Sequence, residues 1–118
     1  MPYGAFGPYP AVVLSWHDGD SGRFDIDTGW ARHNVGDPEL RLTGADGSGV
    51  NAPELNTDAG KAALIHVLEL CPVGTKVTLL SHHWDKYGGR FDGSVTLPDE
   101  RDLAATMVTD GFAVAKVY

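Results

Sequence analysis

Hydrophobic and polar residues alternate along three segments of the chain, as expected of half-buried β-strands. Phe24 and Ile26 alternate with charged residues in the first of these segments. Leucines flank Arg41 in the second, and residues 90–97 repeat the period of two in the third. Two more segments are short, apolar and bounded by turn-forming residues. The expected strands are residues 9–16, 22–30, 39–44, 74–84 and 90–97.

Two other segments have the 3.6-residue period of an amphipathic helix. In residues 56–72, apolar side chains recur at i, i+3, i+4 and i+7 from Leu64, and Pro72 ends the pattern. Residues 98–111 begin with acidic side chains, which suit the positive end of a helix, and end at Gly111. We expect a helix in each segment.

The order of these elements is three strands, a helix, two strands and a second helix. This order predicts an all-β barrel with helices (α+β), namely a five-stranded Greek-key barrel of the OB-fold type. A split α+β sandwich is the competing architecture. The length of 118 residues suits a single domain over residues 1–118, with residues 1–8 as an N-terminal arm and residues 112–118 as a last extended segment.

Charge and composition limit the possible functions. The net charge is −7 and the pI about 4.9, which disfavours a broad DNA-binding surface because such surfaces neutralise phosphates with Lys and Arg. Cys71 is the only cysteine, so the chain has no internal disulfide, and a buried, inert thiol is expected. No apolar run approaches the ~20 residues of a membrane span, so no membrane partner is expected. The N-terminus lacks the features of a signal peptide, which favours a cytoplasmic protein over a secreted one.

Five short motifs occur in a fixed order along the chain: "DGDSG", "RLTG", "NAPEL", "DKYGGR" and "MVTDGFAVA". Each alone is an ordinary turn, strand or helix start, and "DKYGGR" is the most specific. Together, over residues 11–118, they resemble the staphylococcal-nuclease-like (thermonuclease) domain family. The resemblance implies an OB-fold barrel and a Ca²⁺-dependent nuclease that hydrolyses DNA and RNA.

The same resemblance implies roles for individual residues. Asp20 would bind calcium, and Glu54 would position or deprotonate the attacking water. Arg41 and Arg90 would hold the phosphate. The residues that would lie near a terminal phosphate of the substrate are Lys86 and Tyr87.

These residue types suit phosphodiester hydrolysis. Negative charge develops on the phosphate oxygens in the transition state, and fixed cations stabilise it. Arginine provides planar, bidentate donors for this purpose, and both Arg41 and Arg90 lie opposite the apolar face of an expected strand. Calcium prefers hard oxygen ligands such as the carboxylate of Asp20, and a bound metal ion activates or orients water.

The sequence departs from the family pattern on the metal side of the site. The position before "APE" is usually an aspartate that binds calcium, but here it is Asn51. The amide oxygen can coordinate calcium without bringing a charge, so we expect weaker binding. An insertion, "ADGSG", allows a second alignment in which Asp46 is the ligand. We prefer Asn51 because the adjacent "APE" fixes its spacing to Glu54.

Two further departures lie nearer the C-terminus. "DKYGGR" has one glycine more than the common form, so Arg90 needs a different loop. The sequence ends at Tyr118, where classical members of the family continue into another helix. A self-association or protein partner covering this region is therefore expected.

Other chemistry is less well supported by the sequence. His82 and His83 are adjacent, so on a regular strand they would point to opposite faces and would not share a metal ion. Trp16, Trp30 and Trp84 could stack on bases, but strand-end tryptophans more often pack in or beside a core. Three hypotheses follow: an active Ca²⁺-dependent nuclease, a catalytically weak or silent nuclease-like module used in protein assembly, and a metal-independent binder of oligonucleotide or oligosaccharide.

Overall fold

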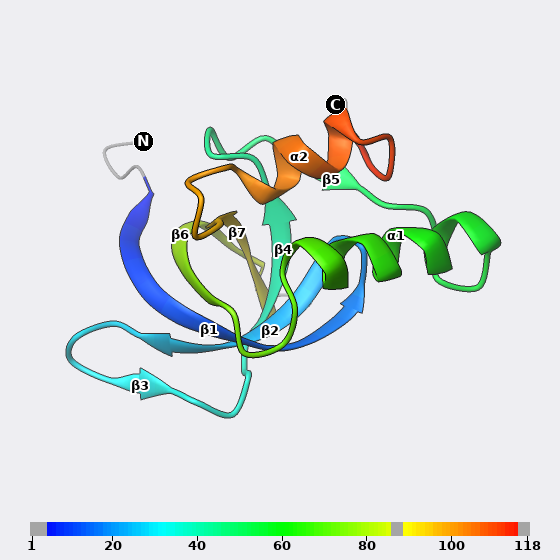
Figure 1. Cartoon of the computed structure of the whole chain (residues 1–118). Coiled ribbons are helices and arrows are strands. Elements are labelled where there is room, and N and C mark those ends of the chain that lie inside the picture. Colours follow the sequence, from blue (N-terminus) through cyan, green and yellow to red (C-terminus); the bar gives the residue numbers. More distant parts are fainter. Residues whose placement is uncertain (1–4, 86–88, 116–118) are drawn as a thin grey trace.

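The computed structural model describes residues 5–85 and 89–115, and in them the chain forms a closed barrel of five strands with two helices packed on it (Figure 1). The barrel strands are β1 (Phe6–Asp18), β2 (Ser21–Asp27), β4 (Glu39–Thr43), β6 (Lys76–Asp85) and β7 (Arg90–Thr96). The short strands are β3 (Arg32–His33), β5 (Val50–Asn51) and β8 (Val114–Ala115), and the helices are α1 (Asp58–Leu70) and α2 (Leu103–Thr109).

The strands pair in the order β1-β6-β7-β4-β2-β3, and an additional β1–β2 pairing closes the barrel. The β4–β7 pair is parallel, and the other pairs of the barrel are antiparallel. Helix α1 lies between the third and fourth barrel strands in chain order, and α2 follows the fifth. The predicted OB-type barrel with these helix positions is confirmed, and the alternative sandwich is wrong.

Several element ends differ from the expectation for local reasons. Strand β1 begins at Phe6, inside the expected N-terminal arm, because Phe6 pairs with Ser81 of β6. Helix α2 begins at Leu103 rather than near residue 98, because the Asp102 side chain accepts the N–H of Ala105 and caps the helix there. The short strands β3 and β5 were not predicted, and β8 lies in the expected extended segment of residues 112–118.

The core fills the barrel and the contact between the barrel and the two helices. Its largest fully buried side chains are Phe24, Leu40, Leu42, Leu79, Leu103 and Met107. Trp16 packs edge-on against Phe24 and donates its indole N–H to the carbonyl of Cys71, 2.9 Å away, at the end of α1. Burial raises the pKa of the Cys71 thiol to about 12, which confirms the expected inert thiol. No helix in the described ranges has the length and apolar character needed to cross a bilayer.

Candidate functional site

The turn between β1 and β2 places Asp20 at the edge of the barrel. The backbone N–H of Asp20 donates to Asp18 Oδ1 (3.0 Å), which closes the turn. Gly19 lies so close to α1 that an added Cβ would be 2.8 Å from the Ala52 side chain and 2.9 Å from that of Ala63. The glycine of "DGD" therefore lets the two acidic residues approach the helix and the segment after β5.

Asp20 is a buried carboxylate with fixed hydrogen-bond donors. Its side chain accepts the backbone N–H of Ala52 at 3.0 Å on Oδ2 and the hydroxyl of Ser21 at 3.2 Å on Oδ1. Burial, together with the neighbouring Asp18 carboxyl, raises its pKa to about 6, although the Ala52 N–H and Arg41 act in the opposite direction. The groups around Asp20 thus stabilise its negative charge less than burial and Asp18 destabilise it.

Arg41 connects Asp20 to Asn51. Its Nη2 atom donates to Asn51 Oδ1 at 2.6 Å and lies 3.9 Å from Asp20 Oδ2. The three residues come from β4, from the β1–β2 turn and from β5, so only the folded barrel brings them together. Of the two alignments left open by the sequence, the structure places Asn51, rather than Asp46, beside Arg41.

Glu54 is two residues beyond the Ala52 N–H that binds Asp20, and its side chain is exposed. The backbone carbonyl of Glu54 accepts both the N–H and the hydroxyl of Thr57, the N-cap residue of α1. Gly60 packs against the same carbonyl so closely that an added Cβ would be only 1.8 Å from the oxygen. The start of α1 therefore fixes the backbone that carries Glu54 and leaves its carboxylate in solvent.

Arg90 is placed relative to Arg41 by the parallel β4–β7 pairing. Arg90 is the register partner of Glu39, and Arg41 is the partner of Asp92 two residues further along. Leu40 and Phe91 alternate with these residues and are buried, so both arginines lie on the outward face of neighbouring strands. The structure thus puts Arg41 and Arg90 on one face of the barrel, one strand and two residues apart.

Asp46 lies in a different environment. It is exposed in the turn of residues 44–48, where its Oδ1 accepts the N–H of Ser48 at 2.9 Å. This hydrogen bond lowers the pKa of Asp46. Asp46 lines an open, polar pocket with His82, His83 and Asp92 rather than the Asp20–Arg41 cluster.

The two adjacent histidines line this same pocket, contrary to the expectation from a regular strand. A β-bulge between Ser81 and His83 breaks the alternation of β6. His82 lies 3.1 Å from the Ser94 hydroxyl, and His83 lies 3.8 Å from Asp92 Oδ2. The predicted substrate residues Lys86 and Tyr87 lie outside the described residues.

The donors near Asp20 fit calcium in kind but are few. Asp18 and Asp20 supply carboxylate oxygens and Asn51 an amide oxygen, all of which are hard ligands that calcium accepts. Within residues 5–85 and 89–115, no group of three or more His, Cys, Asp or Glu side chains is arranged to hold a metal ion. A calcium ion here would therefore need backbone, water or substrate oxygens as additional ligands.

Sequence reasoning missed two glycines and one donor at this site. Gly19 and Gly60 allow the turn and Glu54 to approach α1, and the backbone N–H of Ala52 fixes Asp20. The glycine between the two acids of "DGD" was a visible signal of a close approach, whereas the contacts of Gly60 become apparent only in the fold.

Comparison of the chain with models of protein families and with curated proteins finds no match.

Proposed function

We propose that the chain is a staphylococcal-nuclease-like, Ca²⁺-dependent phosphodiesterase that hydrolyses single-stranded or otherwise flexible DNA or RNA. The grouping of Asp20, Arg41 and Asn51 carries the proposal, because residues of three separate motifs named for the resemblance meet at one place. The face shared by Arg41 and Arg90 supports the same function.

In this proposal, Arg41 and Arg90 bind the non-bridging oxygens of one phosphate and stabilise the charge that develops there. Asn51 and Asp20 hold the Arg41 guanidinium in place, so less conformational freedom is lost on binding. Bound calcium would supply a Lewis acid and an acidified water. Asp18, Asp20 and Asn51 are the residues that would hold the ion.

Glu54 takes the part of general base or water-positioning group. Its carboxylate is exposed to solvent, while Gly60 and Thr57 fix its backbone. Glu54 is two residues along the chain from Ala52, whose N–H binds Asp20, and this shared segment supports the assignment of Glu54 as the base.

A cleavage assay tests this function. A fluorescently labelled single-stranded DNA is incubated with the protein in calcium or in excess chelator. Arg41→Ala and Glu54→Gln should each lower the calcium-dependent rate by roughly 10²–10³-fold, the usual loss when one transition-state contact is removed. The control is Arg101→Ala, which removes an exposed arginine paired with Asp99. Equal rates for the unsubstituted protein and both site variants would refute the proposal.

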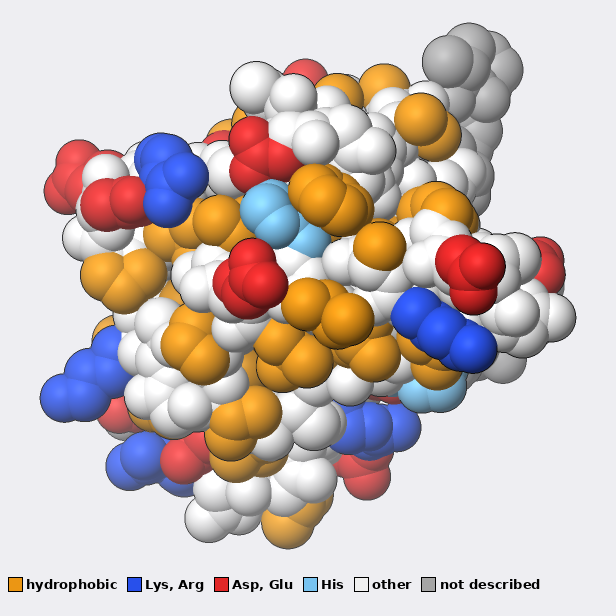
Figure 2. Space-filling view, turned by 45° about the vertical axis from the view of Figure 1, so that its right-hand side comes forward, with side chains coloured by type: hydrophobic (Ala, Val, Ile, Leu, Met, Phe, Trp, Pro, Cys, Tyr) orange, Lys and Arg blue, Asp and Glu red, His pale blue; other side chains and the backbone are white. Residues whose placement is uncertain are grey.

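A module used in protein assembly is the second candidate, and the surface of the helices favours it. Figure 2 shows apolar side chains spread over the face that carries α1 and α2. Ile65, Val73 and Val114 are each more than half exposed. Light scattering with the cleavage assay separates the candidates, because a strictly monomeric, robust nuclease would exclude an assembly role.

A further inference from the structure

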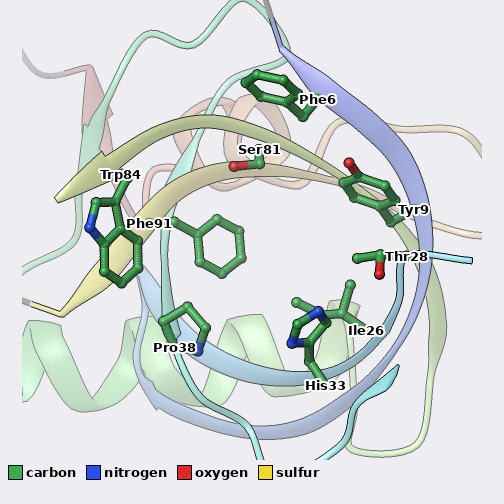
Figure 3. A pocket seen from close by; sticks show the side chains of 9 residues that line it. All are labelled: Phe6, Tyr9, Ile26, Thr28, His33, Pro38, Ser81, Trp84 and Phe91. Carbon is green, nitrogen blue, oxygen red and sulfur yellow. The ribbon is translucent and has the colours of Figure 1, made fainter. Parts of the chain in front are cut away.

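The barrel has an open end lined by aromatic rings (Figure 3). The lining comes from the beginnings of β1 and β7, the ends of β2 and β6, and β3, so the pocket is the mouth of the barrel. Its rings are those of Phe6, Tyr9, His33, Trp84 and Phe91. Neither Asp20 nor Arg41 nor Asn51 lines this pocket, which makes it separate from the site described above.

The pocket has an apolar floor and an exposed aromatic rim. Phe91 and Ile26 are each 8 % exposed and form the floor, whereas Phe6 and Trp84 are each 54 % exposed. Trp84 and Phe91 are register partners across β6 and β7, so their rings come from adjacent positions. The volume is about 220 Å³, below the ~300–1,000 Å³ of pockets for drug-sized ligands. A single planar ring is the ligand of matching size and shape.

Polar groups stand among these rings. Tyr9, His33 and Ser81 line the pocket, and their side chains make no hydrogen bond to the described part of the chain. They can therefore hydrogen-bond to the polar edge of a ligand without breaking a hydrogen bond to the described residues. This combination favours a heteroaromatic ring over a purely apolar one.

The pocket lies at the start of β4 and β7, the two strands that carry Arg41 and Arg90, with Phe91 inside the barrel and Arg90 on the outward face. Phe91 is next to Arg90 in β7, and Pro38 directly precedes Glu39, the register partner of Arg90. From Arg41 to Pro38 the chain advances three residues, or about 10 Å at ~3.3 Å per residue. A nucleic-acid strand rises ~3.4 Å per stacked nucleotide, so about three nucleotides cover this distance.

We propose that the aromatic pocket binds one nucleobase of a single-stranded nucleic acid whose phosphates lie on the Arg41–Arg90 face. The proposal rests on the proposed function and adds how an acidic protein holds its substrate. Ring stacking contributes affinity that does not depend on neutralising phosphates, so it offsets the net charge of −7.

Binding is measured by fluorescence anisotropy in calcium, with a labelled thymidine hexanucleotide and the Glu54→Gln protein, which should leave the strand uncut. Adding Trp84→Ala should weaken binding roughly ten- to a hundredfold, the effect of losing one base–aromatic stack, and Trp84→Phe should restore most of it. The control is Ile65→Ala, because Ile65 is a large apolar side chain on α1 that is 58 % exposed and does not line the pocket. An abasic hexanucleotide should bind weakly and be insensitive to Trp84→Ala.

Equal affinities for Trp84→Ala and Ile65→Ala, or for the normal and abasic strands, would overturn the proposal. Free thymidine should compete with the strand, since the base itself is recognised. If N-acetylphenylalaninamide competes equally well, the assignment to a base is wrong and an aromatic protein side chain is the ligand.

The two proposals fail separately. If cleavage depends on Arg41 but Trp84→Ala does not weaken binding, the base-pocket proposal is refuted and the nuclease proposal stands. If Trp84→Ala weakens binding but no cleavage depends on Arg41, the nuclease proposal is refuted and the base-pocket proposal stands.

Discussion

Asp20 and Asp46 occupy glycine-containing turns at two edges of the same barrel, yet their surroundings differ in every respect that matters for chemistry. Asp20 is buried beside Asp18 and Arg41, and its pKa is raised to about 6. Asp46 is exposed, and the N–H of Ser48 lowers its pKa. Burial with donors from distant strands makes Asp20 the stronger candidate for a functional carboxylate, whereas Asp46 stabilises its own turn.

The largest expected effect comes from Asp20→Asn. This change keeps an oxygen that can accept the Ala52 N–H but removes the charge available to calcium. Calcium-dependent cleavage should fall by more than ~100-fold while the fold is retained. The rate is compared with that of Asp99→Asn, an exposed aspartate paired with Arg101, and circular dichroism checks the fold. Full activity in Asp20→Asn would show that Asp20 is no more important for catalysis than the exposed Asp46.

A tenfold effect in the opposite direction is expected from Asn51→Asp. The substitution restores the negative charge that the resemblance implies at this position, next to Arg41 and Asp20. Calcium affinity should increase roughly tenfold, because one more formal charge faces the ion. Isothermal titration calorimetry measures the affinity, with the exposed Asn56→Asp as the matched control. No gain over that control would mean that Asn51 does not face the metal.

A smaller effect is expected in the pH dependence of stability. The pKa of Asp20 is about 6 in the folded protein and 3.8 as its ordinary value, so the folded state binds the proton more tightly. The resulting stabilisation is complete below pH ~4 and is lost as pH rises through ~6. In chelator, the Tm of unsubstituted protein should therefore fall by a few degrees relative to Asp20→Asn between pH 4 and pH 7.

Parallel melting curves for the two proteins over this range would contradict the buried, protonatable state of Asp20. The same scan on Asp46→Asn provides the comparison, because the lowered pKa of Asp46 acts with the opposite sign.

The smallest effect is expected from Asp46→Ala. The side chain is exposed and its hydrogen bond to Ser48 is local, so the melting temperature should hardly change. The cleavage rate and its calcium dependence should change by less than about twofold, within the usual effect of a surface substitution. A loss of calcium affinity comparable with that of Asp20→Asn would show that Asp46 moves to the ion.

The barrel could be predicted from the sequence because its long strands and two helices have clear periodicities. The strands β3 and β5 were missed because two residues are too few to show a period, whereas β8 lies in the expected last extended segment. The bulge that brings His82 and His83 to one pocket depends on pairing with β7, which is a non-local contact. Motif order identified Asp20, Arg41 and Asn51 as one group, but the hydrogen bonds that join them required the fold.

The aromatic pocket could not be predicted, because its residues are scattered over five strands and two adjoining segments. In the sequence, Trp84 ends an expected strand and Phe6 lies in the expected N-terminal arm. Only closure of the barrel shows that they surround one opening.

The parallel pairing of β4 with β7 has a consequence for how the molecule folds. It joins segments about fifty residues apart, and such contacts form slowly because a long loop must close first. Arg41 and Arg90 lie on either side of this pair, so they become neighbours only when β4 and β7 have paired. Any partly folded chain without this pair lacks the proposed phosphate site, and recovery of phosphate binding during refolding would time the β4–β7 pairing.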